Sequence, residues 1–308
     1  MKTFFKYIAI WSVLVILLLE LTIRIFDLAA KTMPTQNVDG NYLFAPGKSG
    51  FWVRGGLGEL TNYYEINKQG YNSIIDYDRL DPKNLNIALI GDSYIQGFQT
   101  DVRQSIGRQL EDTLGDNTVV HEYGKAGSNI VDFSIIHNKY IQPKSYDFTF
   151  ILATNGDLKP KKPSNMGKGN KIPEKTINRQ MYNNVHILRY LNINHGLGIN
   201  FNKLINQGPE SIDRIYKEKV AEVTEVAFLN KINVEAIKTL PKSIIFLYEG
   251  DKLSPYFMEN FDFEFKKIIH DKLPKDHGFD GHWNKNGRYN CAKAMAEYIR
   301  HNQDRIKN

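Results

Sequence analysis

The chain has 308 residues, 42% of them hydrophobic, which is enough for one large domain or two small ones with a substantial core. Its net charge of +6, from 40 basic and 34 acidic residues, is too dilute to indicate a nucleic-acid partner. The single cysteine, Cys291, excludes an internal disulfide and a cysteine-based metal site.

The N-terminus carries an apolar segment that begins beside two lysines. The stretch from Phe4 to about Phe26 reaches the roughly 20 residues of a membrane-spanning helix if it tolerates Glu20 and Arg24. These two residues stand four apart near the far end, where they can pair and reach the head groups. A cleaved signal peptide and a buried soluble helix are the alternatives, but the sequence that follows is a poor cleavage site. Residues 1–30 are therefore predicted to be an uncleaved membrane anchor.

Lys2 and Lys6 predict the orientation of this anchor, because basic residues are retained on the cytoplasmic side. We therefore expect a single-pass protein of the cytoplasmic membrane whose remaining chain is extracytoplasmic, in the periplasm. Residues 31–82 are rich in Gly, Asn and Tyr without a sustained helical period. They are predicted to form a stalk and an irregular segment with turns such as residues 68–71.

From residue 83 onward, short apolar runs alternate with helical patterns. The predicted strands are residues 85–90, 118–123, 148–153 and 243–248, and the predicted helices are residues 102–114, residues 130–140 and a last helix capped by Asn286. The run at 148–153 is almost wholly apolar, as expected of a strand covered on both faces. Strands alternating with helices predict a mostly parallel sheet wrapped on both sides.

The segment between the third and fourth predicted strands, about 158–240, is the largest insertion in the domain of residues 83–308. It begins with a loop that carries six lysines from Lys159 to Lys175, which could attract an anionic polymer or merely be solvated. The pattern over Pro209–Thr239 then predicts one long helix whose charges agree with the helix dipole. We interpret this insertion as a helical cap beside the sheet.

Parallel α/β sheets bind ligands at the carboxyl ends of their strands, so the residues after each strand are the site candidates. Ser93, in Gly-Asp-Ser after the first strand, has a hydroxyl suited to nucleophilic attack, although a helix N-cap would also explain it. Gly127 follows the second strand and Asn155 the third. Each could donate a hydrogen bond to an oxyanion or simply belong to a turn.

Asp280 and His282 precede the last helix. A carboxylate at this spacing can orient an imidazole that accepts a proton from serine. Asp276 and His277 form an alternative pair just upstream, but the Trp-Asn-x-x-Gly sequence after His282 favours the first pair. The sequence shows no metal-ligand spacing, and neither a metal ion nor an organic cofactor is expected.

The order of a nucleophile serine, a glycine, an asparagine and Asp-x-His resembles the four blocks of the SGNH hydrolase superfamily, also called GDSL hydrolases. The similarity spans roughly Leu85 to the C-terminus, interrupted by the cap. The third block departs from the usual Gly-x-Asn-Asp, because Ala153 replaces the glycine and Gly156 follows the asparagine. The resemblance implies a flavodoxin-like, three-layer α/β/α fold with about five parallel strands.

The resemblance also implies residue roles. Ser93 would be the nucleophile, Asp280 and His282 its partners, and Gly127 and Asn155 would join the Ser93 N–H in an oxyanion hole. The closing block resembles that of bacterial members that modify surface carbohydrates. An N-terminal anchor that ends in Leu-Glu-x-x-x-Arg is similar to theirs as well.

The implied function is a serine esterase that acts through an acyl-serine intermediate, in the first place an O-acyl (acetyl) esterase or O-acyltransferase on acylated cell-surface carbohydrate. A lipid esterase, lysophospholipase or thioesterase is an alternative. A catalytically inactive glycan-binding module is another. The polar, Tyr- and Asn-rich cap favours a sugar over a lipid, since a lipid lid would expose an apolar face.

Overall fold

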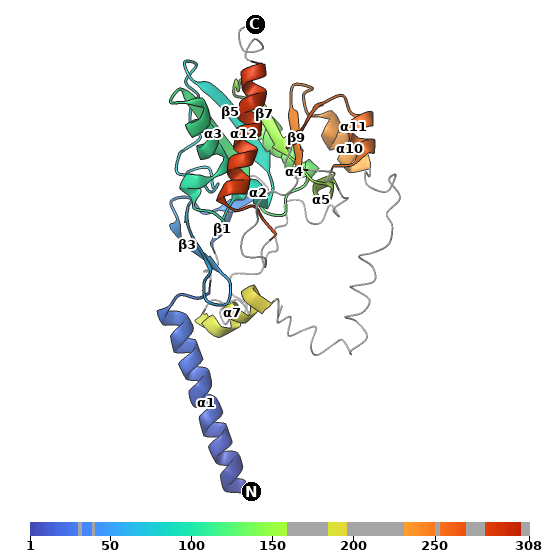
Figure 1. Cartoon of the computed structure of the whole chain (residues 1–308). Helices are drawn as coiled ribbons and strands as arrows, with labels where there is room; N and C mark the ends of the chain where they lie inside the picture. The colour runs from blue at the N-terminus through green and yellow to red at the C-terminus, as the bar shows by residue number, and fades with distance from the viewer. Residues whose placement is uncertain are drawn as a thin grey trace. The chain divides into compact units, whose positions relative to one another are not determined.

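The computed structural model describes residues 1–29, 33–38, 41–158, 184–195, 231–249, 253–268 and 281–302 (Figure 1). The chain divides into two compact units. The first contains the N-terminal helix α1 (Lys2–Ile25), residues Phe51–Thr61 and helix α7 (His186–His195). The second contains a parallel sheet and the helices that cover it.

Five parallel strands form the centre of the second unit. They are β5 (Leu85–Gly91), β6 (Thr118–Gly124), β7 (Phe148–Leu152), β8 (Ile245–Glu249) and β9 (Glu264–Ile268). Their order in the sheet is β6-β5-β7-β8-β9, and every neighbouring pair is parallel. Numbered along the chain this is the order 2-1-3-4-5, whose ligand site lies where the order reverses beside the first strand. The predicted flavodoxin-like sheet is confirmed.

Successive side chains of β5 enter two separate hydrophobic clusters. Ala88 and Ile90 pack with α4 (Ile130–Ile136), α10 (Lys231–Lys238) and α11 (Pro255–Asn260). Ile87 and Leu89 pack with α3 (Ile106–Leu114) and α12 (Lys285–His301). Because successive residues of a strand point to opposite faces, helices cover both sides of the sheet (Figure 1). The predicted three-layer α/β/α arrangement is therefore confirmed.

Three predicted helices differ from the structure in detail. Ser105 caps α3, so the preceding residues Val102–Gln104 form a separate 3-10 turn, η1. The segment predicted as one helix over 130–140 consists of α4, which ends at Ile136, and a π-helical turn, η2 (His137–Ile141), which follows it. The last helix is capped by Asn284, whose side chain accepts the N–H of Asn286, so the predicted cap residue lies inside the helix.

Several elements were not predicted. Strand β9 carries two lysines and lies at the edge of the sheet, where short charged strands are common. The short helices α2 (Ser93–Gln96) and α5 (Asn155–Leu158) follow β5 and β7. Of the helix predicted over Pro209–Thr239, residues 209–230 lie outside the described residues, and α10 covers most of the remainder.

The segment predicted to be a stalk contains two hairpins. Strands β1 (Thr35–Val38) and β2 (Asn41–Phe44) pair with each other, as do β3 (Ser49–Arg54) and β4 (Leu60–Glu65). The second hairpin leads into a loop of residues 67–78, called here the 67–78 loop.

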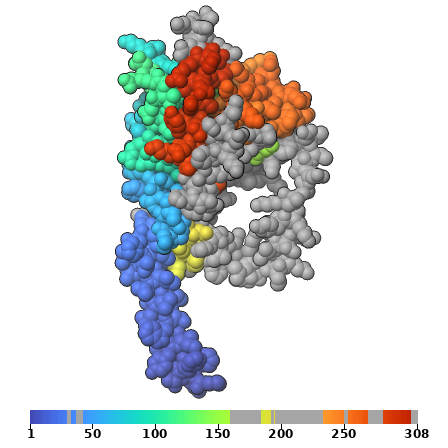
Figure 2. All heavy atoms as spheres, viewed as in Figure 1, coloured from blue at the N-terminus to red at the C-terminus, as the bar shows by residue number. Residues whose placement is uncertain are grey.

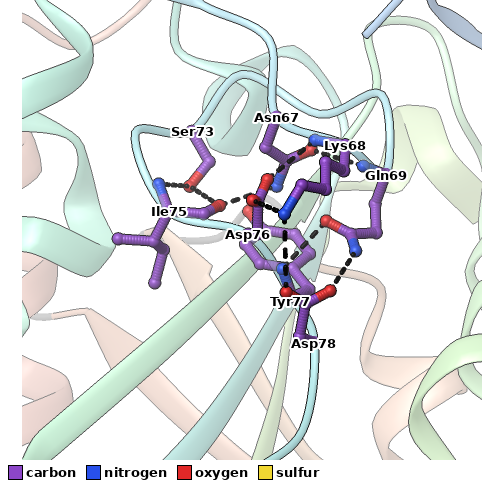
Figure 3. A network of polar contacts seen from close by, with 8 residues as sticks. All are labelled: Asn67, Lys68, Gln69, Ser73, Ile75, Asp76, Tyr77 and Asp78. Atoms are coloured by element: carbon purple, nitrogen blue, oxygen red, sulfur yellow. Dashed lines mark hydrogen bonds and ion pairs between the residues drawn. The ribbon is translucent and has the colours of Figure 1, made fainter. Parts of the chain in front are cut away.

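Polar contacts close the 67–78 loop on itself (Figure 3). The side-chain amide of Asn67 donates to the carbonyl of Ile75 at 2.9 Å, and the ammonium of Lys68 lies 2.7 Å from the carboxylate of Asp76. The predicted turn at residues 68–71 lies in this loop. Its Gly70 has φ +87°, a conformation that favours glycine.

Two tyrosines of the same loop attach it to the sheet. Tyr71 and Tyr77 are buried, and their rings lie 5.2 Å and 5.0 Å from the ring of Tyr123 on β6. The Tyr77 hydroxyl also donates to the backbone carbonyl of Glu122 at 2.8 Å. The 67–78 loop is therefore a packed part of the second unit.

Among the described residues, α1 is the one helix long and apolar enough to cross a membrane, a test that a signal sequence would also pass. Most of its side chains are exposed (Figure 2, blue). The predicted pairing near its end is confirmed, since Glu20 lies 2.7 Å from Arg24. Glu20 also accepts the backbone N–H groups of His186 and Ile187 at 2.9 and 2.8 Å, at the start of α7.

The far end of α7 is held as well. The hydroxyl of Tyr190 donates to the carbonyl of Gly56 at 2.8 Å, and the side chain of Asn194 accepts the N–H of Gly55 at 2.8 Å. Helix α7 therefore contacts both α1 and the turn that connects β3 to β4.

Candidate active site

Ser93 lies directly beyond the carboxyl end of β5. The strand ends at Gly91, and the side chain of Asp92 accepts the N–H of Tyr94 at 3.0 Å and caps helix α2. Ser93 is thus the first residue of the helix, and the capping role that could have explained it belongs to Asp92. Its hydroxyl lies 3.4 Å from the Asp92 carboxylate and makes a shorter contact with another residue.

That contact is with His282. The imidazole Nε2 lies 2.8 Å from Ser93 Oγ, and the pair is partly buried. At this distance a neutral imidazole can accept the serine proton as the hydroxyl attacks. The structure therefore brings together two of the residues that the sequence singled out.

Tyr94 holds the segment that carries His282. Its hydroxyl donates to the carbonyl of Gly281 at 3.1 Å, and its ring lies 4.9 Å from the imidazole and 4.8 Å from the indole of Trp283. Trp283 is 1% exposed, so this segment is anchored in the core. Tyr94 was not predicted to belong to the site, because nothing in its spacing distinguishes it from any other aromatic residue.

Arg288 makes a second link between the two halves of the site. This arginine on α12 is completely buried, and it donates to Thr100 Oγ1 at 2.8 Å and to the carbonyl of Tyr94 at 2.5 Å. It therefore joins α12, which follows His282, to α2, which begins with Ser93. This role was not predicted from the sequence, because arginine is rarely fully buried.

Gly127 and Asn155 follow the two strands that flank β5. Gly127 has φ +75° in the turn after β6, and Asn155 is the first residue of α5 after β7. Since β5 pairs with β6 on one side and β7 on the other, both residues follow the same edge of the sheet as Ser93. Their assignment as oxyanion donors stays a prediction.

Other expected residues lie outside the described part of the chain. These are Asp280, the alternative pair of Asp276 and His277, and the lysines of the loop from Lys159 to Lys175. The choice between the two carboxylate and histidine pairs thus stays a prediction. Within the described residues, no group of three or more His, Cys, Asp or Glu side chains could hold a metal ion.

No protein-family model and no curated protein matches the chain. Solved structures match at low identity, and members of the G-D-S-L lipolytic and esterase families are among these neighbours. A member of the lipolytic protein G-D-S-L family from Veillonella parvula is 10% identical, covers 70% of this chain and 98% of its own, and has a TM-score of 0.36.

Two further neighbours have similar sequence identities, coverages and TM-scores. A putative arylesterase from Agrobacterium tumefaciens is 12% identical, with 70% of this chain and 98% of that chain covered and a TM-score of 0.34. A carbohydrate acetylesterase family member from Sinorhizobium meliloti is 12% identical, with coverages of 70% and 97% and a TM-score of 0.33.

Proposed function

We propose that this chain is a serine hydrolase that acts on ester bonds through an acyl-serine intermediate. One observation carries the proposal: Ser93 Oγ and His282 Nε2 are 2.8 Å apart beyond the carboxyl end of a parallel strand. The hydroxyl is not consumed by helix capping, because Asp92 performs that task. A nucleophile and a base within hydrogen-bond distance are the minimum requirement for acyl transfer to serine.

The roles of the residues follow from acid and base chemistry. His282 accepts the proton of Ser93 as the oxygen attacks the ester carbonyl, and Asp280 orients the imidazole and stabilises its protonated form. The negative charge that develops on the carbonyl oxygen is stabilised by the N–H groups of Ser93 and Gly127 and by the Asn155 side chain. His282 then returns the proton to the departing alcohol, which leaves acyl-Ser93.

The acceptor of the acyl group decides between two activities. Attack by water gives an esterase, and attack by a sugar hydroxyl gives an acyltransferase. We propose acylated cell-surface carbohydrate, such as an acetylated glycan, as the substrate, because the block from Asp280 to Gly287 resembles that of bacterial proteins that modify such polymers. With α1 as a membrane anchor, the site would face the extracytoplasmic side, where these polymers are assembled.

The activity is tested with full-length protein in detergent and a chromogenic acetyl ester. We expect Ser93→Ala and His282→Ala to abolish turnover, while Ser49→Ala and His301→Ala, which change exposed residues, leave it intact. Full activity of Ser93→Ala would refute the proposal. A wild-type protein that binds glycans but has no turnover would support the inactive binding module instead.

A second experiment separates hydrolysis from transfer. The wild-type protein is incubated with the acetyl ester and increasing concentrations of candidate glycans. A transferase partitions the acetyl group into acylated sugar, because an oriented acceptor outcompetes water. Acetate alone at every glycan concentration identifies an esterase.

A further inference from the structure

Helix α2, which begins with Ser93, packs against the last residue of β6 without space for a side chain. A Cβ atom added to Gly124 would lie 2.1 Å from the backbone nitrogen of Gln96 and 2.4 Å from the carbonyl carbon of Ile95. The residue that follows, Lys125, donates its N–H to the carbonyl of Gly91 at 3.2 Å. The nucleophile helix and the segment that leads to Gly127 are therefore in direct backbone contact.

Gln96 spans this contact with its side chain. It is 5% exposed, and its Oε1 accepts the backbone N–H of Ala126 at 2.9 Å. Ala126 immediately precedes Gly127, which has φ +75° and is the expected oxyanion donor. The Gln96 side chain thus connects the helix that begins with Ser93 to the turn that contains Gly127, whose N–H is an expected oxyanion donor.

Gln96 is itself held from the other side. Its backbone carbonyl, in the last turn of α2, accepts the side-chain amide of Asn72 at 2.8 Å. Asn72 is 4% exposed, and its own Oδ1 accepts the N–H of Glu65 at 3.2 Å.

Asn72 belongs to the 67–78 loop, whose internal contacts are drawn in Figure 3. In addition, Asn67 Oδ1 accepts the N–H of Tyr71, the residue directly before Asn72, at 3.0 Å. The loop therefore supports α2 from outside the parallel sheet.

We infer that Gln96 is a positioning residue that fixes the Gly127 N–H relative to Ser93, and that Asn72 holds Gln96 in place. The inference rests on the proposed function for its catalytic consequence, but its geometric content is independent of it. Oxyanion donors act only when they are preorganised at the position where charge develops. Loss of the Gln96 contact frees the 125–128 turn and weakens stabilisation of the transition state while leaving substrate binding almost unchanged.

The test compares Gln96→Met with Gln109→Met in the full-length protein. Both replace a buried glutamine by an apolar side chain of similar length, but Gln109 bonds to Gln104 and Lys285, away from the turn. We expect Gln96→Met to lower kcat for the acetyl ester about 10- to 100-fold with KM changed less than about twofold. Gln96→Glu keeps an accepting oxygen and should recover part of the loss.

Hydrogen exchange supplies a readout that does not require turnover. The amides of residues 125–128 should exchange faster in Gln96→Met and in Asn72→Ala than in wild type, and at the wild-type rate in Gln109→Met. Unchanged exchange in Gln96→Met would overturn the inference. So would a kcat equal to that of Gln109→Met.

Failure of the proposed function has a different signature. In that case wild type and Ser93→Ala would show the same absence of turnover, while the exchange measurement would still decide whether Gln96 holds the turn.

Discussion

The guanidinium of Arg288 donates to the backbone carbonyl of Tyr94, the residue that follows Ser93, at 2.5 Å across 194 positions of sequence. Burial raises the pKa of Glu122, a nearby buried carboxylate, against the lowering effects of Arg108, of the hydrogen bonds from Ser105 and Gly107, and of Arg288. Removing Arg288 would therefore leave two acceptors without a hydrogen bond that they now receive, the Tyr94 carbonyl and the Thr100 hydroxyl, and would remove a positive charge that lowers the pKa of Glu122.

We accordingly expect Arg288→Met to lower the free energy of unfolding by about 3 kcal/mol, as is usual when one member of a buried charged network is removed. Arg300→Met is the matched control on the same helix, because Arg300 is exposed and its side chain donates to the carbonyl of Thr113 at 2.7 Å. It should cost less than about 0.5 kcal/mol. Chemical denaturation of the two variants checks the difference, and equal losses would contradict it.

Gly124→Ala should separate α2 from β6. The new methyl group would overlap the backbone of Ile95 and Gln96, which cannot move as a flexible side chain could. We expect a loss of a few kcal/mol in stability and about 100-fold in turnover. Gly56→Ala is the control, since within the described part of the chain its Cβ would meet only the Tyr190 hydroxyl, at 3.6 Å. A fully active Gly124→Ala protein would show that the close packing is dispensable.

Acid should destabilise the protein through His121. Burial lowers the pKa of His121 to about 3, from 6.5 in the unfolded chain, and its Nδ1 lies 2.6 Å from the hydroxyl of Tyr146. Below pH 6.5 the unfolded chain binds a proton that the folded state rejects, so stability falls as the pH falls. The loss from this group amounts to about 2 kcal/mol at about pH 5.

The variant His121→Gln isolates that contribution. It cannot take up the proton in the unfolded state, so its free energy of unfolding should decrease less than that of wild type between about pH 7.5 and about pH 5. Denaturation curves at several pH values measure this slope. Parallel slopes would mean that another group causes the acid sensitivity.

The sheet was predictable because β5, β7 and β8 are largely apolar runs of the length that a buried strand requires, and β6 has a similar length and ends at a glycine. The position of Ser93 followed, since the residues after parallel strands gather at one edge. Strand β9 was not predictable, because it is a lysine-containing edge strand that needs little apolar character.

The contacts that support the site could not be predicted from the sequence either. Tyr94, Gln96 and Arg288 act through partners distant in the chain, and no local period or spacing marks such contacts. The predicted helix ends differ from the observed ones by a few residues for a related reason. Asn284 and Asn286 are both good caps, and only the backbone conformation decides between them.

Asp280→Asn tests the choice of the carboxylate. If Asp280 orients His282, the amide favours the wrong tautomer, and kcat should fall about 10³- to 10⁴-fold while a small residual activity remains. Asp276→Asn should leave kcat unchanged, because Asp276 belongs to the alternative pair. The opposite result, with Asp276→Asn inactive and Asp280→Asn active, would assign the role to Asp276.

The N-terminal helix should be retained in the mature protein. Glu20 accepts two N–H groups at the start of α7, so cleavage after the apolar segment would remove a contact of the folded chain. We expect the intact mass of the membrane-extracted protein to include α1. An alkaline phosphatase fused to the C-terminus should be active, because the domain is expected on the extracytoplasmic side. A mature N-terminus near Lys31, or an inactive fusion with an active cytoplasmic reporter, would contradict this topology.

Glu20→Ala tests the same contact within the full chain. The first N–H groups of a helix have no partner inside the helix, so the amides of His186 and Ile187 depend on the Glu20 carboxylate. They should exchange with solvent faster in this variant. Glu235→Ala is the control, because it removes an exposed carboxylate whose ion pair with Lys238 spans 3.9 Å. Since α7 contacts both α1 and the turn between β3 and β4, faster exchange confined to Glu20→Ala would indicate that α1 stabilises the start of α7. Equal exchange in both variants would show that the Glu20 carboxylate does not protect these amides.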